Sequence, residues 1–337
     1  MVNIEWDKLK FAYQPVKSNL RYTYSDGRWD EGKLYTTYDV TLNVAANVLH
    51  YGQAIFEGLK AFQCVDGKVR IFRPQANAKR INSSASRLLM PTFPEDKFVE
   101  AVRKVVADNI EYVPPYGTGG ALYIRPVMYG TTPQIGVSPA TEFQLVFIVV
   151  PVGAYYKGGI KPVDACVSTD FDRAAPLGTG MIKCAGNYAS SLLPGKIAKE
   201  KFHCPVALFF DPKTHEYVDE FGTSNFLAIT ADGTYITPKS NSILPSITND
   251  SLMTVAADLG MKVERRPIHR RELPGLAEVA ACGTAVVLTP VARIFDGDQV
   301  YTYGEEIGPV LKKLYDAMTG IQAGKNPDIH NWLVDVL

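Results

Sequence analysis

The chain has 337 residues, about twice the size of a typical domain, so two domains are expected. Lysine plus arginine and aspartate plus glutamate each number 35, and a chain without a basic excess is not expected to bind nucleic acid. Its hydrophobic fraction of 46% and charged fraction of 21% exclude a disordered chain.

No stretch of the sequence has the length and hydrophobicity of a membrane span. The longest apolar run, Phe143 to Val152, is short and is broken by Pro151. The N-terminal residues lack the apolar core of a signal peptide and carry early acids. The five cysteines form no C-x-x-C pair, so free thiols are expected rather than disulfides or a zinc site. These features predict a cytoplasmic protein without a membrane partner.

The first half of the sequence predicts strands and two helices. Runs rich in β-branched and aromatic residues predict strands at 34–40, 69–72, 121–129 and 143–150. Apolar residues recur at helical spacing from Ala78 to Leu89, with Asn77 as the expected cap. A second helix is expected from about Glu95 to Tyr112, before two prolines.

Small residues, proline and glycine make the segment 168–180 a predicted linker. The second half then predicts helices at 187–201, 247–259 and 307–318, and strands at 206–210, 225–229, 262–264 and 278–281. Asp232 and Gly233 predict a tight hairpin turn. The expected fold class is α+β, with domains 1–167 and 181–337 on either side of the linker.

Several common catalytic signatures are missing. The sequence has no G-x-x-x-x-G-K-[ST] phosphate loop, no G-x-G-x-x-G between a strand and a helix, no H-E-x-x-H and no G-x-S-x-G. The histidines are isolated, so no metal site is expected. Cofactors other than nucleotides and metals therefore remain open.

Lys183 lies in the most unusual cluster of the sequence, among glycine, alanine and cysteine residues beside the expected linker. Its simpler interpretation is a solvated surface charge. However, ligand clefts form at domain junctions. Burial there lowers the pKa of an amine from about 10.4, and a neutral amine is what Schiff-base chemistry requires.

Four further sites allow both a functional and a simpler interpretation. Glu220 is either part of an acidic turn or a carboxylate that holds a ring nitrogen protonated. Residues 244–248 and 282–285 are either anion sites or merely a helix cap and a turn. Arg80, on the polar face of the first helix, is either a third anion ligand or a solvated cation.

Taken in order, six motifs resemble the branched-chain amino acid aminotransferases, which are pyridoxal phosphate enzymes of fold type IV. The motifs are His50–Gly58, Arg73–Arg80, Tyr123–Pro126, Lys183–Tyr188, Glu220–Asn225 and Cys282–Ala285. The resemblance covers about residues 30–300. It implies a smaller N-terminal α/β domain, a larger C-terminal domain with a mixed sheet, and a homodimer.

The resemblance also implies a role for each matching residue. Lys183 matches the lysine that forms the internal aldimine and shuttles the proton. The other cofactor-binding positions comprise phosphate ligands, the ring-nitrogen carboxylate and a tyrosine beside the phenolic oxygen: Arg80, Ile247, Thr248, Thr284, Glu220 and Tyr188. The substrate-binding positions form the side-chain pocket and receive the carboxylates: Tyr51, Phe56, Tyr123, Arg125, Thr223 and Ala285.

The implied reaction is a ping-pong transfer of the amino group between L-leucine, L-isoleucine or L-valine and 2-oxoglutarate. Arg125 is expected to help accept the second carboxylate of glutamate. The sequence departs from the family in two places. Ser246 stands where glycine is frequent, and Val286–Thr289 replaces the C-x-x-C of animal members, so their redox switch is not expected.

Two other functions remain open at this point. One is another fold type IV enzyme, a D-amino acid aminotransferase or an aminodeoxychorismate lyase, which would be expected to lack the wall of Tyr51, Phe56 and Tyr123. The other is a non-enzymatic protein that binds a small anion. That protein would have no use for a buried amine opposed by a carboxylate.

Overall fold

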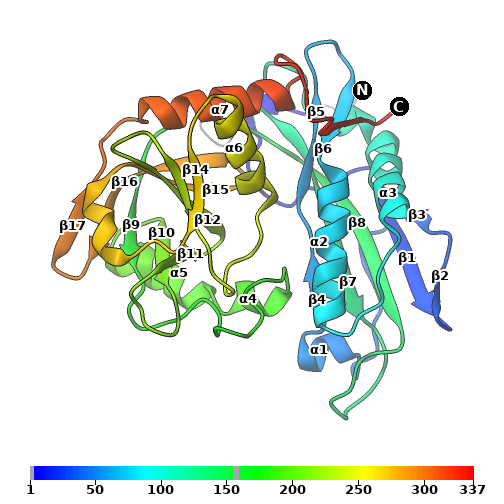
Figure 1. Cartoon of the computed structure of the whole chain (residues 1–337). Helices are drawn as coiled ribbons and strands as arrows, with labels where there is room; N and C mark the ends of the chain where they lie inside the picture. The colour runs from blue at the N-terminus through cyan, green and yellow to red at the C-terminus, as the bar shows by residue number, and fades with distance from the viewer. Residues whose placement is uncertain (1–3, 155–158) are drawn as a thin grey trace. The chain divides into compact units, whose positions relative to one another are not determined.

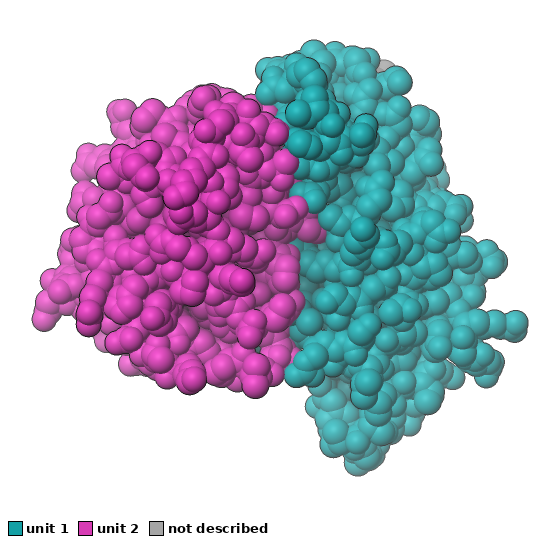
Figure 2. All heavy atoms as spheres, viewed as in Figure 1, with its two compact units in different colours: residues 1–155, 182–186, 320–337 teal, residues 156–181, 187–319 magenta. Residues whose placement is uncertain are grey.

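The computed structural model describes residues 4–154 and 159–337. The chain divides into two compact units (Figure 2). Unit 1 comprises residues 1–155, 182–186 and 320–337, and unit 2 comprises residues 156–181 and 187–319. The units therefore interleave in the sequence. Because unit 1 also takes the C-terminal residues, it is not the smaller of the two.

Unit 1 is built on an antiparallel sheet. In order across the sheet, its strands are β18 (Leu333–Asp335), β6 (Val69–Phe72), β5 (Leu59–Gln63), β7 (Ala121–Gly130), β8 (Phe143–Val152), β1 (Asn19–Ser25) and β2 (Arg28–Trp29). Two short strands pair with it at the side, β3 (Lys33–Tyr35) with β1 and β4 (Ala54–Phe56) with β7. The strand expected at 34–40 thus ends at Tyr35.

Helices cover one face of this sheet (Figure 1). They are α2 (Pro74–Arg87) and α3 (Glu95–Asp108), with the short α1 (Asn47–Tyr51) and 3-10 turns at Trp6–Lys8 and Ile110–Tyr112 elsewhere in the unit. The apolar faces of α2 and α3 pack on inward residues of the strands, such as Leu122 and Ile124, which are fully buried.

The start of α2 differs from the expectation. Arg73, with a φ of 50°, is the N-cap, and Pro74 occupies the first turn, where a missing N–H costs nothing. Asn77 is therefore inside the helix. Its buried side chain donates to Glu57 instead of capping the helix.

Unit 2 is built on a mixed sheet that closes on itself. The strand order is β11 (Val218–Phe221), β10 (Val206–Phe210), β9 (Val163–Val167), β16 (Val287–Asp296), β15 (Leu276–Gly283), β12 (Ser224–Thr230), β13 (Tyr235–Pro238) and β14 (Val263–Arg266). Because β11 also pairs with β12, the strands from β11 to β12 form a closed barrel. A further strand, β17 (Gln299–Thr302), pairs with β16.

The position of strand β9 does not agree with the expected boundary of the first domain at residue 167. It lies within the range 1–167 predicted for the first domain, yet it pairs in parallel with β10 and β16 of the second sheet. Parallel pairing joins segments that are far apart in sequence, so no local pattern revealed it.

The helices associated with unit 2 are α4 (Ala185–Ala189), α5 (Leu192–Lys201), α6 (Ile247–Asp258) and α7 (Pro309–Gln322), with a 3-10 turn at Arg270–Gly275. The single helix expected at 187–201 is thus two helices. At the predicted turn, β12 and β13 form an antiparallel hairpin around Asp232 and Gly233, where Gly233 has a φ of 83°. In the described part of the chain, no helix is long and apolar enough to cross a membrane.

Candidate active site

Lys183 lies in unit 1, two residues before α4, and its backbone is fixed by hydrogen bonds to α2 and β4. Its backbone N–H donates to Ser84 Oγ on α2 at 3.0 Å, and its carbonyl accepts the Phe56 N–H of β4 at 3.0 Å. Its neighbours Ile182 and Cys184 are buried in the core of unit 1. Lys183 itself, between these two buried residues, is only partly buried. Its Nζ lies 4.8 Å from the centre of the Phe56 ring.

Arg80 lies one helical turn before Ser84 on α2 and is clamped by Glu57. Arg80 Nε donates to Glu57 Oε1 at 2.7 Å, and Nη2 donates to Oε2 at 2.7 Å. The Glu57 side chain is fully buried and that of Arg80 is 11% exposed. The carboxylate also accepts from Asn77. Since Ser84 binds the Lys183 backbone, α2 brings Arg80 and Lys183 into the same part of unit 1.

Three of the predicted pocket residues lie together on unit 1. The Arg125 guanidinium stacks 4.6 Å from the Phe56 ring centre and 5.3 Å from that of Tyr123. Arg125 Nη2 also donates to the Tyr123 hydroxyl at 2.9 Å. Arg125 Nε is buried and has no acceptor among the described residues. Tyr51 makes a different contact, because its hydroxyl donates to the carbonyl of Ile135.

Glu220 is the centre of a buried polar group in unit 2. Its Oε1 pairs with Arg173 Nη1 at 2.7 Å and accepts the Leu244 N–H at 3.2 Å. Its Oε2 accepts from Asn225 Nδ2 at 3.0 Å. The same Asn225 amide donates to the carbonyl of Leu244 at 3.0 Å. Strand pairing of Glu220 with Asn225, and of Asn225 with Cys282, aligns the three side chains across the sheet.

The two turns predicted to receive the substrate carboxylate lie at the same end of this sheet. Thr223 is in the turn between β11 and β12, and Thr284 and Ala285 are in the turn between β15 and β16. Because β12 and β15 are paired from Asn225 and Cys282 onward, both turns emerge beside each other. The structure therefore brings Thr223, Thr284 and Ala285 together.

The segment just before α6 is hydrogen-bonded to the buried polar group around Glu220. Ser246 is its N-cap, and its side chain accepts from the Asn249 N–H at 3.1 Å. Ile247 and Thr248 are the first helical residues, so their N–H groups are among the donors that lack partners within a helix. Leu244, two residues before the cap, is bound by Glu220 and Asn225. The helix start is thus anchored on the β11–β12 hairpin.

Tyr188 lies on α4, next to a residue that fixes this segment. The neighbouring Asn187 side chain accepts from Thr179 Oγ1 at 2.6 Å and donates to the Thr179 carbonyl at 2.7 Å. The Tyr188 carbonyl accepts from Ser191 Oγ at 2.8 Å. These bonds hold the chain on both sides of Tyr188.

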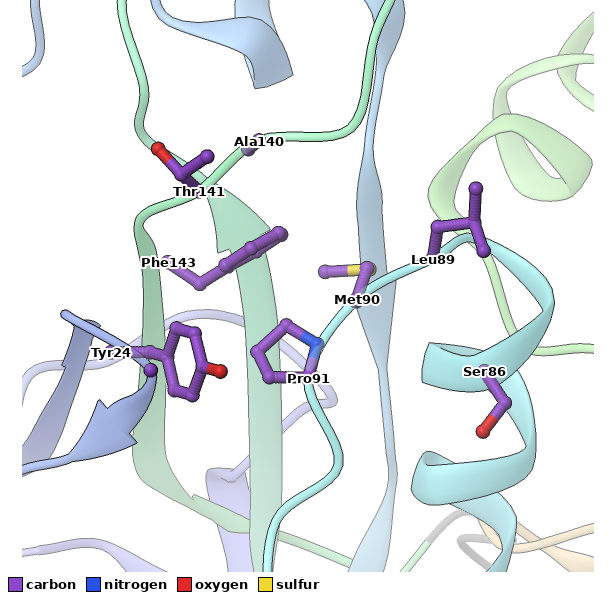
Figure 3. Close-up of a pocket in the computed structure, with 9 residues that line it drawn as sticks. Tyr24, Ser86, Leu89, Met90, Pro91, Ala140, Thr141 and Phe143 are labelled. Carbon is purple, nitrogen blue, oxygen red and sulfur yellow. The ribbon is translucent and has the colours of Figure 1, made fainter.

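A separate hollow of about 590 Å³ lies on unit 1, between β1, the end of α2 and the start of β8 (Figure 3). Its lining includes Tyr24, Met90, Pro91 and Phe143, whose side chains converge in the view. None of the residues that line it is charged. The hollow therefore lacks the cations and the amine that distinguish the candidate site.

Sequence reasoning missed several residues that the structure places at the predicted groups. Glu57 and Arg173 supply buried counter-charges to Arg80 and Glu220. Lys60 lies on β5 opposite Tyr123 on β7, and burial lowers the pKa of its amine to about 8. Glu57 stands within the first motif, but its partner is 23 residues away on a helix. The pairing was therefore not visible in the sequence.

Residues 54–294 match the family described as amino-transferase class IV. The match spans more than half of the chain, so the chain belongs to the class IV aminotransferases, and its α+β architecture is that of fold type IV. A branched-chain-amino-acid aminotransferase of Haemophilus influenzae is 45% identical, with 100% of each chain covered. One of Helicobacter pylori is 43% identical, covering 99% of this chain and 98% of that protein.

Solved structures that are similar to this chain are also branched-chain amino acid aminotransferases. The branched-chain amino acid aminotransferase of Escherichia coli has a TM-score of 0.77 at 28% identity, over 94% of this chain and 99% of that chain. The enzyme of Thermobaculum terrenum, solved in its PLP-form, has a TM-score of 0.77 at 25% identity, over 95% of this chain and 99% of that chain. The cofactor of this family is pyridoxal 5'-phosphate.

Each unit contains types of group that this cofactor requires. An aldehyde requires an amine, and Lys183 of unit 1 is one; a phosphate requires cations or amides, which are present as Arg80 in unit 1 and as the start of α6 in unit 2. A pyridine nitrogen is matched by the buried carboxylate of Glu220. Each group is held by hydrogen bonds or ion pairs within its own unit.

Proposed function

We propose that the chain transfers the amino group between branched-chain L-amino acids and 2-oxoglutarate. The observation that carries this proposal is the aromatic group of Phe56 and Tyr123 with the Arg125 guanidinium stacked against it. An apolar wall suits the side chains of leucine, isoleucine and valine. A cation with a buried, unpaired Nε suits the second carboxylate of glutamate.

Pyridoxal phosphate supplies the electron sink that this reaction needs. The chain's own residues bind, orient and move protons around it. Lys183 Nζ is the amine that would take the proton from the substrate Cα and deliver it to C4′ of the cofactor. Arg80, Ile247, Thr248 and Thr284 would hold the phosphate, and Tyr188 would contact the phenolic oxygen. Thr223 and Ala285 receive the substrate α-carboxylate at the paired turns.

Replacement of Lys183 tests this assignment. Lys183→Ala is expected to lose both the visible absorption of the bound cofactor and the transfer of amino groups from L-leucine, because Lys183 is the amine assigned to the cofactor aldehyde. Lys196→Ala, which alters an exposed lysine of α5, is the matched control and should keep both. A Lys183→Ala protein that retains its absorption and turnover would refute the role of Lys183.

A panel of amino donors separates the proposal from the related enzymes. L-leucine, L-isoleucine and L-valine should all convert the resting absorption spectrum, and D-alanine should not. Conversion by D-amino acids alone would favour a D-amino acid aminotransferase. A protein that binds no coloured cofactor would favour the simple anion-binding function.

We also propose that the protein is a cytoplasmic homodimer. Four large apolar side chains on unit 1, two near α1 and two on the loop between β7 and β8, are 60% exposed or more: Val44, Leu49, Ile135 and Val137. Hydrogen bonds join the two segments, from Gln134 N–H to the Ala45 carbonyl and from Asn47 to the Ser138 carbonyl. Exposed apolar groups of this kind favour association. Light scattering should report twice the chain mass.

A further inference from the structure

Arg173 is a buried cation on the segment that leads toward Lys183. Its side chain is only 6% exposed. Its Nη1 lies 2.7 Å from Glu220 Oε1 and also donates to the carbonyls of Ser242 at 3.1 Å and Gly180 at 3.4 Å. A Cβ on Gly180 would collide with the Ser242 carbonyl, so the two backbones meet at the guanidinium. The position of Arg173 is therefore fixed from several sides.

The surroundings of Glu220 contain other titratable groups, but these do not neutralise it. Asp219, the preceding residue on β11, accepts from Ser242 Oγ, and burial raises the pKa of its carboxyl. Cys282 faces Glu220 from β15, and burial together with the Glu220 charge raises the pKa of its thiol. Asn225 on β12 and Leu244 are neutral donors. Among the described residues of unit 2, Arg173 is the cation paired with Glu220.

We propose that Arg173 is a positioning residue that keeps Glu220 ionised, and thereby keeps the proton shared with the cofactor's ring nitrogen on the nitrogen. This proposal rests on the proposed function, in which Glu220 faces that nitrogen. Only one proton moves: a protonated Glu220 beside a neutral ring exchanges with an ionised Glu220 beside a protonated ring. No other bond changes, and no oxidant or further reactant is needed.

The direction of the effect follows from electrostatics in a buried site. A carboxylate removed from water without a cation tends to take up a proton. If Arg173 were absent, Glu220 would therefore compete with the ring nitrogen for the shared proton. A neutral ring is a weaker electron sink, so turnover would fall although the substrate contacts on unit 1 were unchanged.

The experiment uses the holoenzyme reconstituted with cofactor that carries nitrogen-15 in its ring. The chemical shift of that nitrogen reports its protonation without any turnover. Arg173→Met should move the shift toward the unprotonated value, with a midpoint at least one pH unit lower, which is a tenfold weaker hold on the proton. Arg173→Lys, which keeps the charge, should restore much of the wild-type shift.

The control is Arg293→Met, which removes the partly exposed pair of Arg293 with Asp164 on the same sheet and should leave the shift unchanged. In steady-state kinetics, Arg173→Met should lower kcat about tenfold or more with little change in KM for L-leucine. A role in folding alone would lower stability without moving the nitrogen shift.

Glu220→Gln separates this proposal from the assignment of Glu220 itself. If Glu220→Gln leaves the nitrogen shift at the wild-type value, Glu220 does not face the ring and the residue assignment of the proposed function fails. If Glu220→Gln moves the shift and Arg173→Met does not, the role proposed for Arg173 is overturned and that of Glu220 stands. If both move it and Arg173→Lys restores it, the proposal is supported.

Discussion

At the scale of single residues, two charges expected to contact the cofactor, Arg80 and Glu220, are each held by an opposite charge of their own unit. Arg80 is held by Glu57 and Glu220 by Arg173, and all four side chains are buried or nearly so. Such pairs contribute little net stability, but losing one partner leaves an uncompensated buried charge. The pairs therefore fix geometry, and single substitutions in them should be costly.

Glu57→Gln tests this cost in unit 1. The change leaves the Arg80 guanidinium buried against a neutral amide, so the free energy of unfolding of the apoprotein should fall by about 3 kcal/mol. Urea denaturation measures it. Asp164→Asn, in the partly exposed pair with Arg293, should cost well under half as much. Equal losses of stability in the two variants would show that breaking the buried Glu57–Arg80 pair costs no more than breaking the partly exposed Asp164–Arg293 pair.

Lys60 gives a prediction that depends on pH. Burial lowers the pKa of its amine from 10.5 to about 8, so the folded protein releases the proton more readily than the unfolded chain. The stability of the protein should therefore rise with pH between about 8 and 10.5, and the cost of holding the charged amine should be greatest below pH 8.

Lys60→Met removes that cost. The variant should be more stable than the wild type at pH 7, by roughly 2 kcal/mol, and this difference should shrink toward pH 10. Denaturation at the two pH values measures it, and Lys104→Met, on the exposed face of α3, is the control. A gain in stability that is the same at both pH values would mean that the charge of Lys60 is not its cause.

At the scale of elements, the start of α6 combines a helix cap with residues proposed to hold the phosphate. Ser246 accepts the Asn249 N–H and so satisfies one of the donors that the helix leaves open. Serine stands here where the family often has glycine. Since both residues are good caps, the departure should change the phosphate site only slightly.

Two substitutions at Ser246 separate the contributions of the side chain and the backbone. Ser246→Ala should lower the free energy of unfolding by about 1 kcal/mol, whereas Ser246→Gly should lower it by only a few tenths, because glycine exposes the helix start to solvent. Thermal unfolding of the apoprotein measures both. The prediction fails if the glycine variant is the less stable of the two.

Elements with a strong local pattern were predicted well from the sequence. The strand at 69–72, the start of the helix at 247 and the hairpin at Asp232 and Gly233 agree with the structure. Strands β4, β9 and β11 were missed because each is short and is stabilised by pairing with distant segments. The start of α2 was misplaced because Arg73 adopts a left-handed conformation that arginine seldom takes.

The same distinction applies to the candidate site. Residues carried by a motif, such as Lys183 and Glu220, could be named from the sequence because their neighbours are distinctive. Arg173 could not be named from the sequence, because it lies in a segment whose composition is typical of a linker. Its partner Glu220 is 47 positions further along the chain. The roles of the named residues toward the cofactor stay predictions, which the variants above test.

At the scale of the whole molecule, the five cysteines are all free and buried. Burial raises the pKa of Cys64, Cys166 and Cys282, and that of Cys204 to about 12. Because the thiolate is the reactive form, these thiols should react slowly with iodoacetamide in the folded protein at pH 8.

Mass spectrometry after alkylation checks this expectation. We expect almost no labelling within minutes under native conditions and up to five labels in guanidinium chloride. Rapid native labelling of any of the four thiols with a raised pKa would contradict the burial described for that residue. The unfolded protein serves as its own control for reagent activity.

The interleaving of the two units has a consequence for synthesis of the chain. Strand β6 pairs on one side with β5, and on its other side with β18, whose residues Leu333–Asp335 are translated more than 260 residues later. Until β18 has been translated, this edge of β6 has no partner strand. An unpaired strand edge can pair with other chains. The β6 edge should therefore be prone to pairing with other chains until Leu333–Asp335 have been translated.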